Sequence, residues 1–265
     1  AFYAYSPLQL VVVLTGVVLL AVDWRYHWAD RQGLLRGLAI LALLAAPYVR
    51  FRLQYPEALS QHLTQLRSYW VSSQPLGVKI GEFLRRYVHG FDPAYWFLPN
   101  SSDLIRHQMK GMGHMRLISL PFVLLGLIAA LRRLKDPAWR VVLIALLVAP
   151  TGAALVDVAI TRLLVMLLPL CYLALLGMEQ LIAWLAQKHT QLAARWVEVG
   201  LALLWAVLAG SMTVNALKNG PIWYEDYGLY GMQWGGETLF EEIKAFRQAH
   251  PDKEVHLSPS WANGT

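Results

Sequence analysis

The apolar stretch LISLPFVLLGLIAAL, residues 117–131, contains no charged side chain. A helix needs roughly 20 mainly apolar residues to cross a bilayer, and with its flanks this stretch predicts a membrane helix over residues 117–132. The preceding stretch, SSDLIRHQMKGMGHM at residues 101–115, is basic and holds a single carboxylate, Asp103. A long apolar segment beside a polar connection is the pattern of a membrane protein.

The composition of the chain supports this prediction. Hydrophobic residues make up 57% of the sequence and charged residues 15%, against about 25% charged residues in ordinary soluble domains. The net charge is +6, but Lys and Arg fall mainly in short loops between apolar segments, which indicates membrane topology rather than nucleic-acid binding. Cys171 is the only cysteine, which excludes a disulfide framework and a cysteine metal site.

The predicted fold class is a mainly α, polytopic membrane protein with about six transmembrane helices. It carries amphipathic interfacial helices in a long outer loop and the start of a soluble α/β outer domain. The chain divides into two membrane helices (1–49), the outer loop (50–116), four membrane helices (117–214), and a connector that leads into the soluble domain (215–265). The predicted membrane helices cover residues 7–22, 34–49, 117–132, 141–157, 162–185 and 197–214.

The distribution of cations predicts the orientation. Three short loops, DWRYHWADRQGLLR, RRLKDPAWR and QKHTQLAAR, are basic, whereas the short loop on the opposite side, around residues 157–162, offers Arg162 alone. The positive-inside rule places the three basic loops in the cytoplasm. We therefore expect a multi-pass protein of the inner or plasma membrane, with both ends of this chain and segment 50–116 extracytoplasmic.

The polar segments also show helical patterns. Residues 55–71 and 75–91 have apolar side chains at helical spacing, as in helices that lie on a membrane surface. Residues 237–249 predict a soluble amphipathic helix, and EVHLS at 254–258 predicts a strand. Because the chain starts without a methionine and ends as this strand begins, we expect it to be an internal piece of a longer protein.

Two interpretations are open for the cations of the 101–115 stretch. They can extend to lipid headgroups beside a membrane helix. Alternatively, they hold a phosphate or diphosphate, since Arg and Lys donate to phosphate oxygens and Gly111 and Gly113 allow a close backbone approach. Two histidines without a further ligand do not complete a metal site, so neither a metal nor a cofactor is predicted. The predicted lipid-phosphate ligands here are Arg106, His107, Lys110 and His114.

Arg162 is a second candidate for anion binding. It has apolar residues on both sides, and Asp157 lies five residues earlier. An ionisable residue at a membrane edge commonly faces a partner or a cavity. Either Arg162 forms an ion pair with Asp157, or it faces an anionic ligand at the outer surface.

Aromatic clusters flank these candidates. They are expected either to form interfacial belts or to line a groove for a sugar or an acceptor. The residues predicted for that groove are Tyr69, Trp70, Tyr95, Trp96 and Asp157.

Several stretches in order resemble one family of enzymes. They are DWRYHW, SYW, PLGVKI, YWFLPN, DLIRHQMKGMGHM, ITRLLVMLLPL and YEDYGLYGMQWGGETLF. Together they resemble the bacterial membrane glycosyltransferases related to protein O-mannosyltransferases and aminoarabinose transferases, which share the GT-C fold (glycosyltransferase family 39-like). The resemblance covers most of the chain and depends on the order of these stretches rather than on one sharp motif.

The resemblance implies an enzyme that moves a sugar, with mannose as one candidate, from a polyprenyl-phosphate donor to an acceptor on the outer side of the membrane. The acceptor would be a glycan, a lipid or a protein, and membrane lipids surround the enzyme. In the family an arginine near the outer end of a late span contacts the lipid phosphate, which fits Arg162 followed by Pro169. The family's catalytic aspartate belongs to the first outer loop and is expected upstream of Ala1.

Two other classes of function remain open. The same cations would suit a transporter or flippase for a lipid-linked anion, in which they only capture the ligand. A non-enzymatic scaffold of the cell envelope is the third possibility, and it predicts that segment 50–116 tolerates the loss of its charges.

Overall fold

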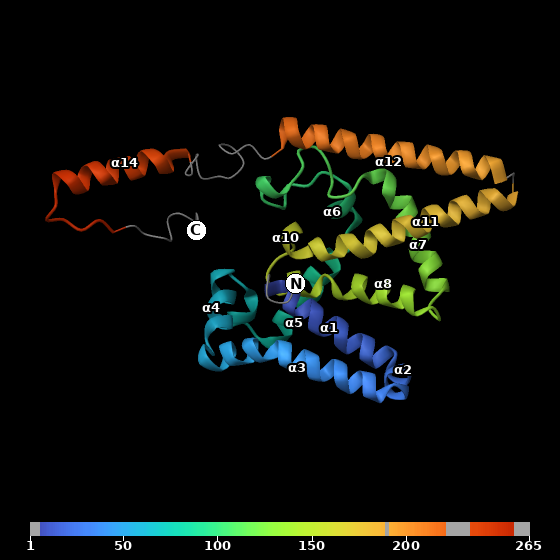
Figure 1. Cartoon of the computed structure of the whole chain (residues 1–265), viewed down its shortest axis with the longest axis horizontal. Helices are drawn as coiled ribbons and strands as arrows, with labels where there is room; N and C mark the ends of the chain where they lie inside the picture. Colours follow the sequence, from blue (N-terminus) through green and yellow to red (C-terminus); the bar gives the residue numbers. More distant parts are fainter. Residues whose placement is uncertain (1–5, 189–190, 221–233, 257–265) are drawn as a thin grey trace.

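The computed structural model is mainly helical (Figure 1). It describes residues 6–188, 191–220 and 234–256, and within these ranges no β-strand forms. Of the predicted strand 254–258, residues 254–256 have no regular structure and the rest lie outside the described residues. The helices are α1 (Ser6–Val22), α2 (Trp24–Ala29), α3 (Arg31–Gln54), α4 (Ala58–Gln65), α5 (Leu76–His89), α6 (Pro93–Phe97), α7 (Leu120–Arg132), α8 (Pro137–Val148), α9 (Thr151–Ala154), α10 (Ile160–Leu163), α11 (Leu167–Lys188), α12 (Gln191–Asn219) and α14 (Trp234–Ala249).

Four helical segments are long and apolar enough to cross a membrane. They are Arg31–Gln54, Pro137–Ala154, Ile160–Lys188 and Ala193–Asn219. The other two predicted spans form shorter apolar helices, Leu8–Val22 and Leu117–Arg132. The membrane character of the chain is therefore supported, while the number of six spans and the α/β domain are not confirmed.

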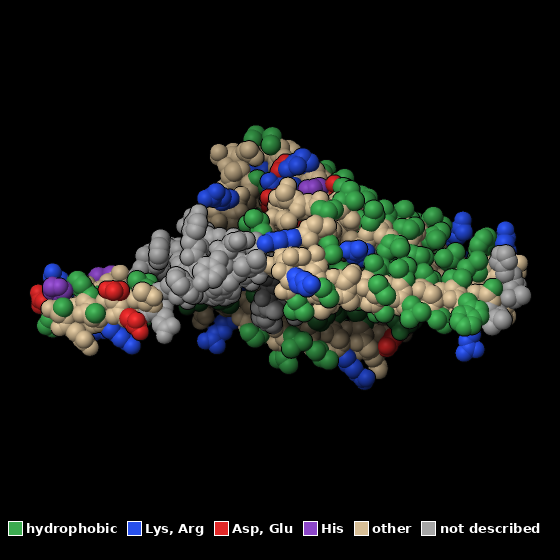
Figure 2. Space-filling model, turned by 90° about the horizontal axis from the view of Figure 1, so that it is seen from above, with side chains coloured by type: hydrophobic (Ala, Val, Ile, Leu, Met, Phe, Trp, Pro, Cys, Tyr) green, Lys and Arg blue, Asp and Glu red, His purple; other side chains and the backbone are tan. Residues whose placement is uncertain are grey.

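The basic connections gather at one end of the bundle. In Figure 1, α2, the link between α7 and α8, and the start of α12 lie towards the right, while α4, α5 and α10 lie towards the left. Figure 2 shows a broad apolar face with Lys and Arg side chains projecting at its right-hand end. The three loops that the positive-inside rule assigns to one side therefore share one end of the structure.

The closest helix packing joins α7 to α11. A Cβ atom added to Gly126 would collide with the carbonyl oxygen of Leu173, and one added to Gly177 would collide with the carbonyl oxygen of Phe122. Without side chains at these two positions, the backbones approach closely enough to bury Ala130 and Leu173 completely. Small residues that allow such an approach are typical of helix packing in membranes, where lipid offers no hydrophobic drive for helix association.

An ion pair fastens α1 to α8 at the basic end. Arg140 in α8 donates from Nη2 to Oδ1 of Asp23 at 2.5 Å and from Nε to Oδ2 at 3.3 Å. Its Nη1 donates to the carbonyl oxygens of Leu134 and Lys135 at 2.9 and 2.8 Å. The guanidinium thus closes the α7–α8 connection and holds it against the turn that follows α1.

Segment 50–116, predicted to be the outer loop and called the outer segment below, is more broken than its sequence pattern predicts. The expected helix over 55–71 is divided into α4 and a 3₁₀ turn, Tyr69–Val71, because Arg67 adopts a φ of 53°, which no α-helix contains. The expected helix over 75–91 forms as α5. Asp92 caps α6 by accepting from Ala94 N–H at 2.8 Å, and Pro93 occupies the first turn, where a missing N–H costs nothing.

Beyond the bundle, the predicted amphipathic helix 237–249 lies within α14. Its apolar side chains Leu239, Phe240 and Phe246 are exposed. Figure 1 shows α14 apart from the other helices.

Candidate functional site

The carboxylate of Asp103 is the centre of a buried polar network in the outer segment. Its side chain is 1% exposed. Oδ2 accepts hydrogen bonds from the Tyr95 hydroxyl and from Nε2 of His114, both at 2.9 Å. Oδ1 accepts from the backbone N–H of Ile160 at 2.8 Å. Because a carboxylate only accepts, Nε2 of His114 carries the proton in this contact. Asp103 therefore ties the outer segment to the first residue of α10.

The partners of Asp103 decide its charge. Burial raises the pKa of this carboxyl, but hydrogen bonds from His114, from the Ile160 N–H and from Tyr95 outweigh burial, so the pKa lies below its ordinary value of 3.8. Burial, together with the Asp103 charge, raises the pKa of Tyr95 far above its ordinary value. At neutral pH the network consequently contains an anionic Asp103 and a neutral, donating Tyr95.

Local sequence builds the turn that presents Asp103. The Asn100 side-chain oxygen accepts from the N–H and hydroxyl groups of Ser102, at 3.2 and 3.0 Å, and from the Asp103 N–H at 3.4 Å. The Gln108 amide in turn donates to the Asp103 carbonyl oxygen. An asparagine that bonds to the backbone two or three residues later is a common way to fix a turn.

Gly111 and Gly113, in the 101–115 stretch, are needed for the backbone conformation and packing of this loop. A Cβ on Gly113 would lie 2.5 Å from the carbonyl carbon of Phe97, so only glycine fits beneath that backbone. A backbone hydrogen bond from the Met115 N–H to the Trp96 carbonyl oxygen, at 2.8 Å, helps to hold the neighbouring His114 beside Asp103. Gly111 has a φ of 72°, a conformation that glycine adopts without strain.

Side chains of the outer segment hold the turn between α9 and α10, residues 154–160. The hydroxyl groups of Ser68 and Tyr69 donate to the carbonyl oxygens of Leu155 and Ala154, both at 2.6 Å. At the far end of the turn, Asp103 accepts from the Ile160 N–H, as described above. The turn is therefore tied to the outer segment from residues 68–69 on one side and from residue 103 on the other.

Arg162 follows directly after this turn and is half-buried. Its Nη1 donates to the backbone oxygen of Asp157 at 3.3 Å, and this is the one hydrogen bond that its side chain makes to the described residues. The ion pair with the Asp157 carboxylate, one of the two interpretations of Arg162, is not formed. That carboxylate is 72% exposed and lies 3.8 Å from Arg86, and it accepts from the Val158 N–H at 2.9 Å. Arg162 thus retains guanidinium donors that no described carboxylate occupies.

Arg86 in α5 links several of the predicted groove residues. Its guanidinium lies 4.8 Å from the centre of the Tyr69 ring, and Nε donates to Glu82 at 2.6 Å. The Trp70 ring packs beside Tyr69 at 5.7 Å between centroids. With its contact to Asp157, Arg86 places Tyr69, Trp70 and Asp157 in one neighbourhood.

The other two predicted groove residues lie in the protein interior. Tyr95 is 3% exposed and Trp96 1%. Trp96 donates from Nε1 to the Gly90 carbonyl oxygen at 2.8 Å, and the Tyr95 hydroxyl is occupied by Asp103. Their rings pack against each other and against His114, so both contribute to the support of the site and not to an open surface.

The remaining predicted phosphate ligands lie on the loop before α7. The backbone of Arg106 and His107 forms a 3₁₀ turn, Ile105–His107, but the side chain of Arg106 lies outside the described part of the structure. His107 and Lys110 are half-buried. Arg162 belongs to α10, so it and segment 107–110 lie on different elements. Among the described residues, no group of three or more His, Cys, Asp or Glu side chains is arranged to hold a metal ion.

Sequence reasoning missed the residues that organise this region. Asp103 is the only carboxylate of the basic stretch, and a lone acid among cations is a signal that it is paired. Arg86 gave no signal, because i, i+4 pairing with Glu82 looks like an ordinary solvated helix face. Ser68 and Asn100 are of residue types found in every loop, so only the folded chain identifies their partners.

Comparisons with known proteins do not assign a function to this region, which is therefore interpreted from its geometry. No model of a known protein family matches the chain, and neither characterised proteins nor solved structures give a match.

Proposed function

We propose that the chain belongs to a membrane glycosyltransferase that moves a sugar from a polyprenyl-phosphate donor to an acceptor on the outer side of the membrane. The observation that carries the proposal is Arg162. Arg162 lies near the start of the apolar helical segment Ile160–Lys188, directly after the turn that Ser68, Tyr69 and Asp103 hold in place. No described carboxylate forms an ion pair with it.

The position of Arg162 suits a lipid-linked phosphate. A prenyl chain would lie along apolar helices while its phosphate stays at their polar ends, which is where this guanidinium is found. Arginine donates to phosphate oxygens in a planar fork, and this contact is stronger than that of a neutral donor. Lys110, His107 and Arg106 stand on the adjoining polar loop and remain candidates for the same anion.

In the proposed reaction, an acceptor hydroxyl attacks the anomeric carbon of the donor and the bond from that carbon to the phosphate oxygen breaks. A base takes the hydroxyl proton, and the electron pair of the broken bond remains on the polyprenyl phosphate. Arg162 would stabilise the negative charge that develops on this leaving group. We assign no residue of this chain as the base. The polar network around Asp103 would keep the start of α10, and hence Arg162, in place.

Donor binding tests this function. Full chain in lipid nanodiscs is titrated with polyprenyl monophosphate and with uncharged polyprenol. We expect Arg162→Ala to weaken phosphate binding by about tenfold to a hundredfold, since a hydrogen bond to a charged group contributes about 1.5–3 kcal/mol. Arg162→Lys should lose less, and polyprenol should bind weakly to all forms. Arg36→Ala, at the basic end of α3, is the matched control.

Equal affinity of wild type and Arg162→Ala for the phosphate would contradict the assignment. A flippase for the same anion would also bind it, so transfer must be measured separately. Sugar appearing on an added acceptor supports the transferase, whereas movement of an unaltered donor between leaflets supports the flippase.

A further inference from the structure

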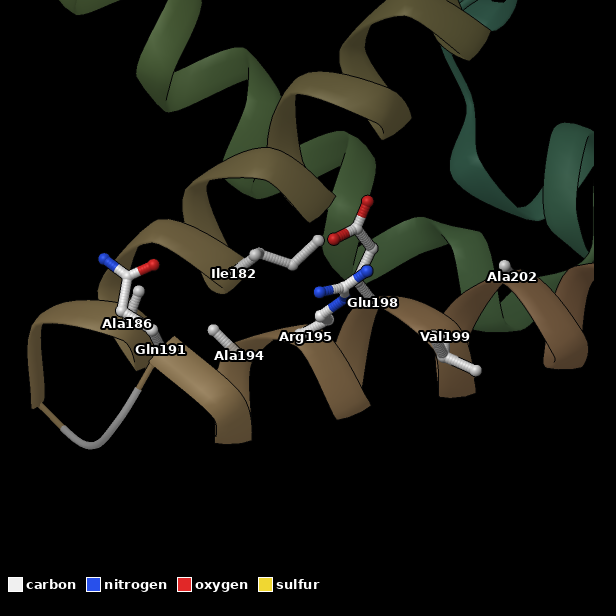
Figure 3. A pocket seen from close by; sticks show the side chains of 8 residues that line it. All are labelled: Ile182, Ala186, Gln191, Ala194, Arg195, Glu198, Val199 and Ala202. Carbon is white, nitrogen blue, oxygen red and sulfur yellow. The ribbon is translucent and has the colours of Figure 1, made fainter.

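A cleft between α11 and α12 lies at the end of the bundle that carries the basic connections. Its volume is about 830 Å³, and its apolar walls come from both helices, with Ile182 and Ala186 on α11 and Val199 and Ala202 on α12. Figure 3 shows Arg195 and Glu198 extending from α12 towards α11. The cleft is far along the chain from Arg162 and plays no part in the proposed transfer.

We propose that this cleft binds one phospholipid with an ethanolamine headgroup. Arg195 and Glu198 stand three residues apart on one helix, so their side chains are neighbours on its surface. Together they offer one cation and one anion, with the Gln191 amide on the same rim. An ethanolamine headgroup carries the complementary pair, a phosphate and a primary ammonium with N–H donors. The phosphate binds Arg195 and the ammonium donates to Glu198.

The surroundings place this pair at headgroup depth. Arg195 and Glu198 follow the start of α12 by four and seven residues, or about 6 and 10 Å along the helix axis. Exposed Trp184 and Trp196 lie at the same level of the two helices, and Lys188 lies 4.9 Å from the centre of the Trp184 ring. Tryptophans and cations of this kind mark the interface of a membrane.

Arg195 and Glu198 form no ion pair with other described residues, which leaves both charges available to a lipid headgroup. The apolar window of α12 has none of its residues buried inside the structure, as expected of a helix that borders lipid. Ionised side chains facing lipid are costly unless paired. Basic sites between membrane helices bind lipid headgroups in other proteins, and here the added carboxylate selects a headgroup with a cation.

Native mass spectrometry of the full chain tests the proposal. Detergent-solubilised protein is incubated with phosphatidylethanolamine, phosphatidylglycerol and phosphatidylcholine that carry the same acyl chains. We expect wild type to retain one phosphatidylethanolamine. Phosphatidylcholine should bind less well because its ammonium has no N–H, and phosphatidylglycerol because it has no cation for Glu198.

Two variants separate the two contacts. Arg195→Gln should weaken retention of phosphatidylethanolamine about tenfold or more. Glu198→Gln should remove the preference over phosphatidylglycerol while lipid is still bound. Lys135→Gln, an exposed cation at the same end, should change neither property. Helix content by circular dichroism verifies folding, and Arg195→Lys, which retains the charge, should retain the preference with intermediate affinity.

Three results would overturn the proposal. They are equal retention of the three lipids by wild type, unchanged retention after Arg195→Gln, and a dimer of the chain that protects this cleft in place of lipid.

Discussion

Asp103 and Ile160 are 57 residues apart in the sequence, yet Oδ1 of the aspartate accepts the backbone N–H of Ile160 at 2.8 Å. This bond joins the loop before α7 to the beginning of α10. It also provides an acceptor for the Ile160 N–H, which is at the start of a helix and has no acceptor within the helix itself. The same carboxylate accepts hydrogen bonds from Tyr95 and His114. A single side chain therefore joins α6, the loop before α7 and the start of α10.

Asp103→Asn should destabilise the protein by about 1–3 kcal/mol. The amide replaces one accepting oxygen with a donor, which then faces the N–H of Ile160 or the donors of Tyr95 and His114, and a buried donor is left unsatisfied. Thermal unfolding in detergent measures the loss. Asp252→Asn, at an exposed position, should leave stability within about 0.5 kcal/mol of wild type. Equal stability of the two variants would show that the network contributes nothing.

Stability should fall in acid partly through Asp103. Because the pKa of Asp103 in the folded state lies below its ordinary value of 3.8, its contribution is fully present above that value and is lost as pH falls through the lower, folded pKa. Unfolding midpoints between pH 7 and pH 3 should therefore drop less in Asp103→Asn than in wild type.

A second carboxylate titrates nearby. Hydrogen bonds from Arg85 and Arg86 lower the pKa of Glu82 from 4.5 to about 2, so its contribution also disappears as pH falls below 4.5. Measuring the Asp103 effect in a Glu82→Gln background removes this overlap. If the unfolding midpoint falls with pH by the same amount in the presence of Asp103 and in its Asn variant, the Asp103 carboxyl does not titrate as the network predicts.

Gly126→Ala should separate α7 from α11, because its Cβ would collide with the Leu173 backbone, and backbone cannot move aside as a flexible side chain can. Overpacking of this kind costs about 1–3 kcal/mol. Gly200→Ala is the matched control in α12, where nothing lies within 4 Å of the new atom, and it should be neutral or slightly stabilising because alanine favours helix. Unfolding midpoints of both variants, compared with wild type, test the contact. A stable Gly126→Ala would mean that the helices are not in direct contact.

The Asp23–Arg140 ion pair should give a coupling free energy of about 1–3 kcal/mol in a double-mutant cycle of Asp23→Asn and Arg140→Gln. Its side chains are only 18% and 22% exposed, so water screens them weakly. The pair Glu82–Arg85, in which the arginine side chain is 64% exposed, should couple much more weakly, because water screens an exposed pair. Additive effects of Asp23→Asn and Arg140→Gln would show that the contact does not fasten α1 to α8.

The sequence by itself determined the mainly helical character of the chain, the approximate position of the apolar helices, four of them in segments long enough to cross a membrane, and the gathering of basic loops at one end. These properties follow from local composition, since the length of an apolar run and the placement of Lys and Arg between runs need no knowledge of distant contacts. The amphipathic segments within α5 and α14 are predictable for the same reason, because a helical period is visible in neighbouring residues.

Only the tertiary structure decided which polar side chains meet. Asp157 and Arg162 are five residues apart, and an ion pair between them was one of two interpretations, yet the Asp157 carboxylate lies 3.8 Å from Arg86 instead. Tyr95 and Trp96 resemble surface aromatics in the sequence but are buried beneath His114. The break of the 55–71 helix at Arg67 is likewise invisible to a hydrophobic period. These outcomes depend on tertiary contacts, such as those between Arg86 and Asp157 and between Tyr95 and His114, and their geometry exists only once the chain has packed.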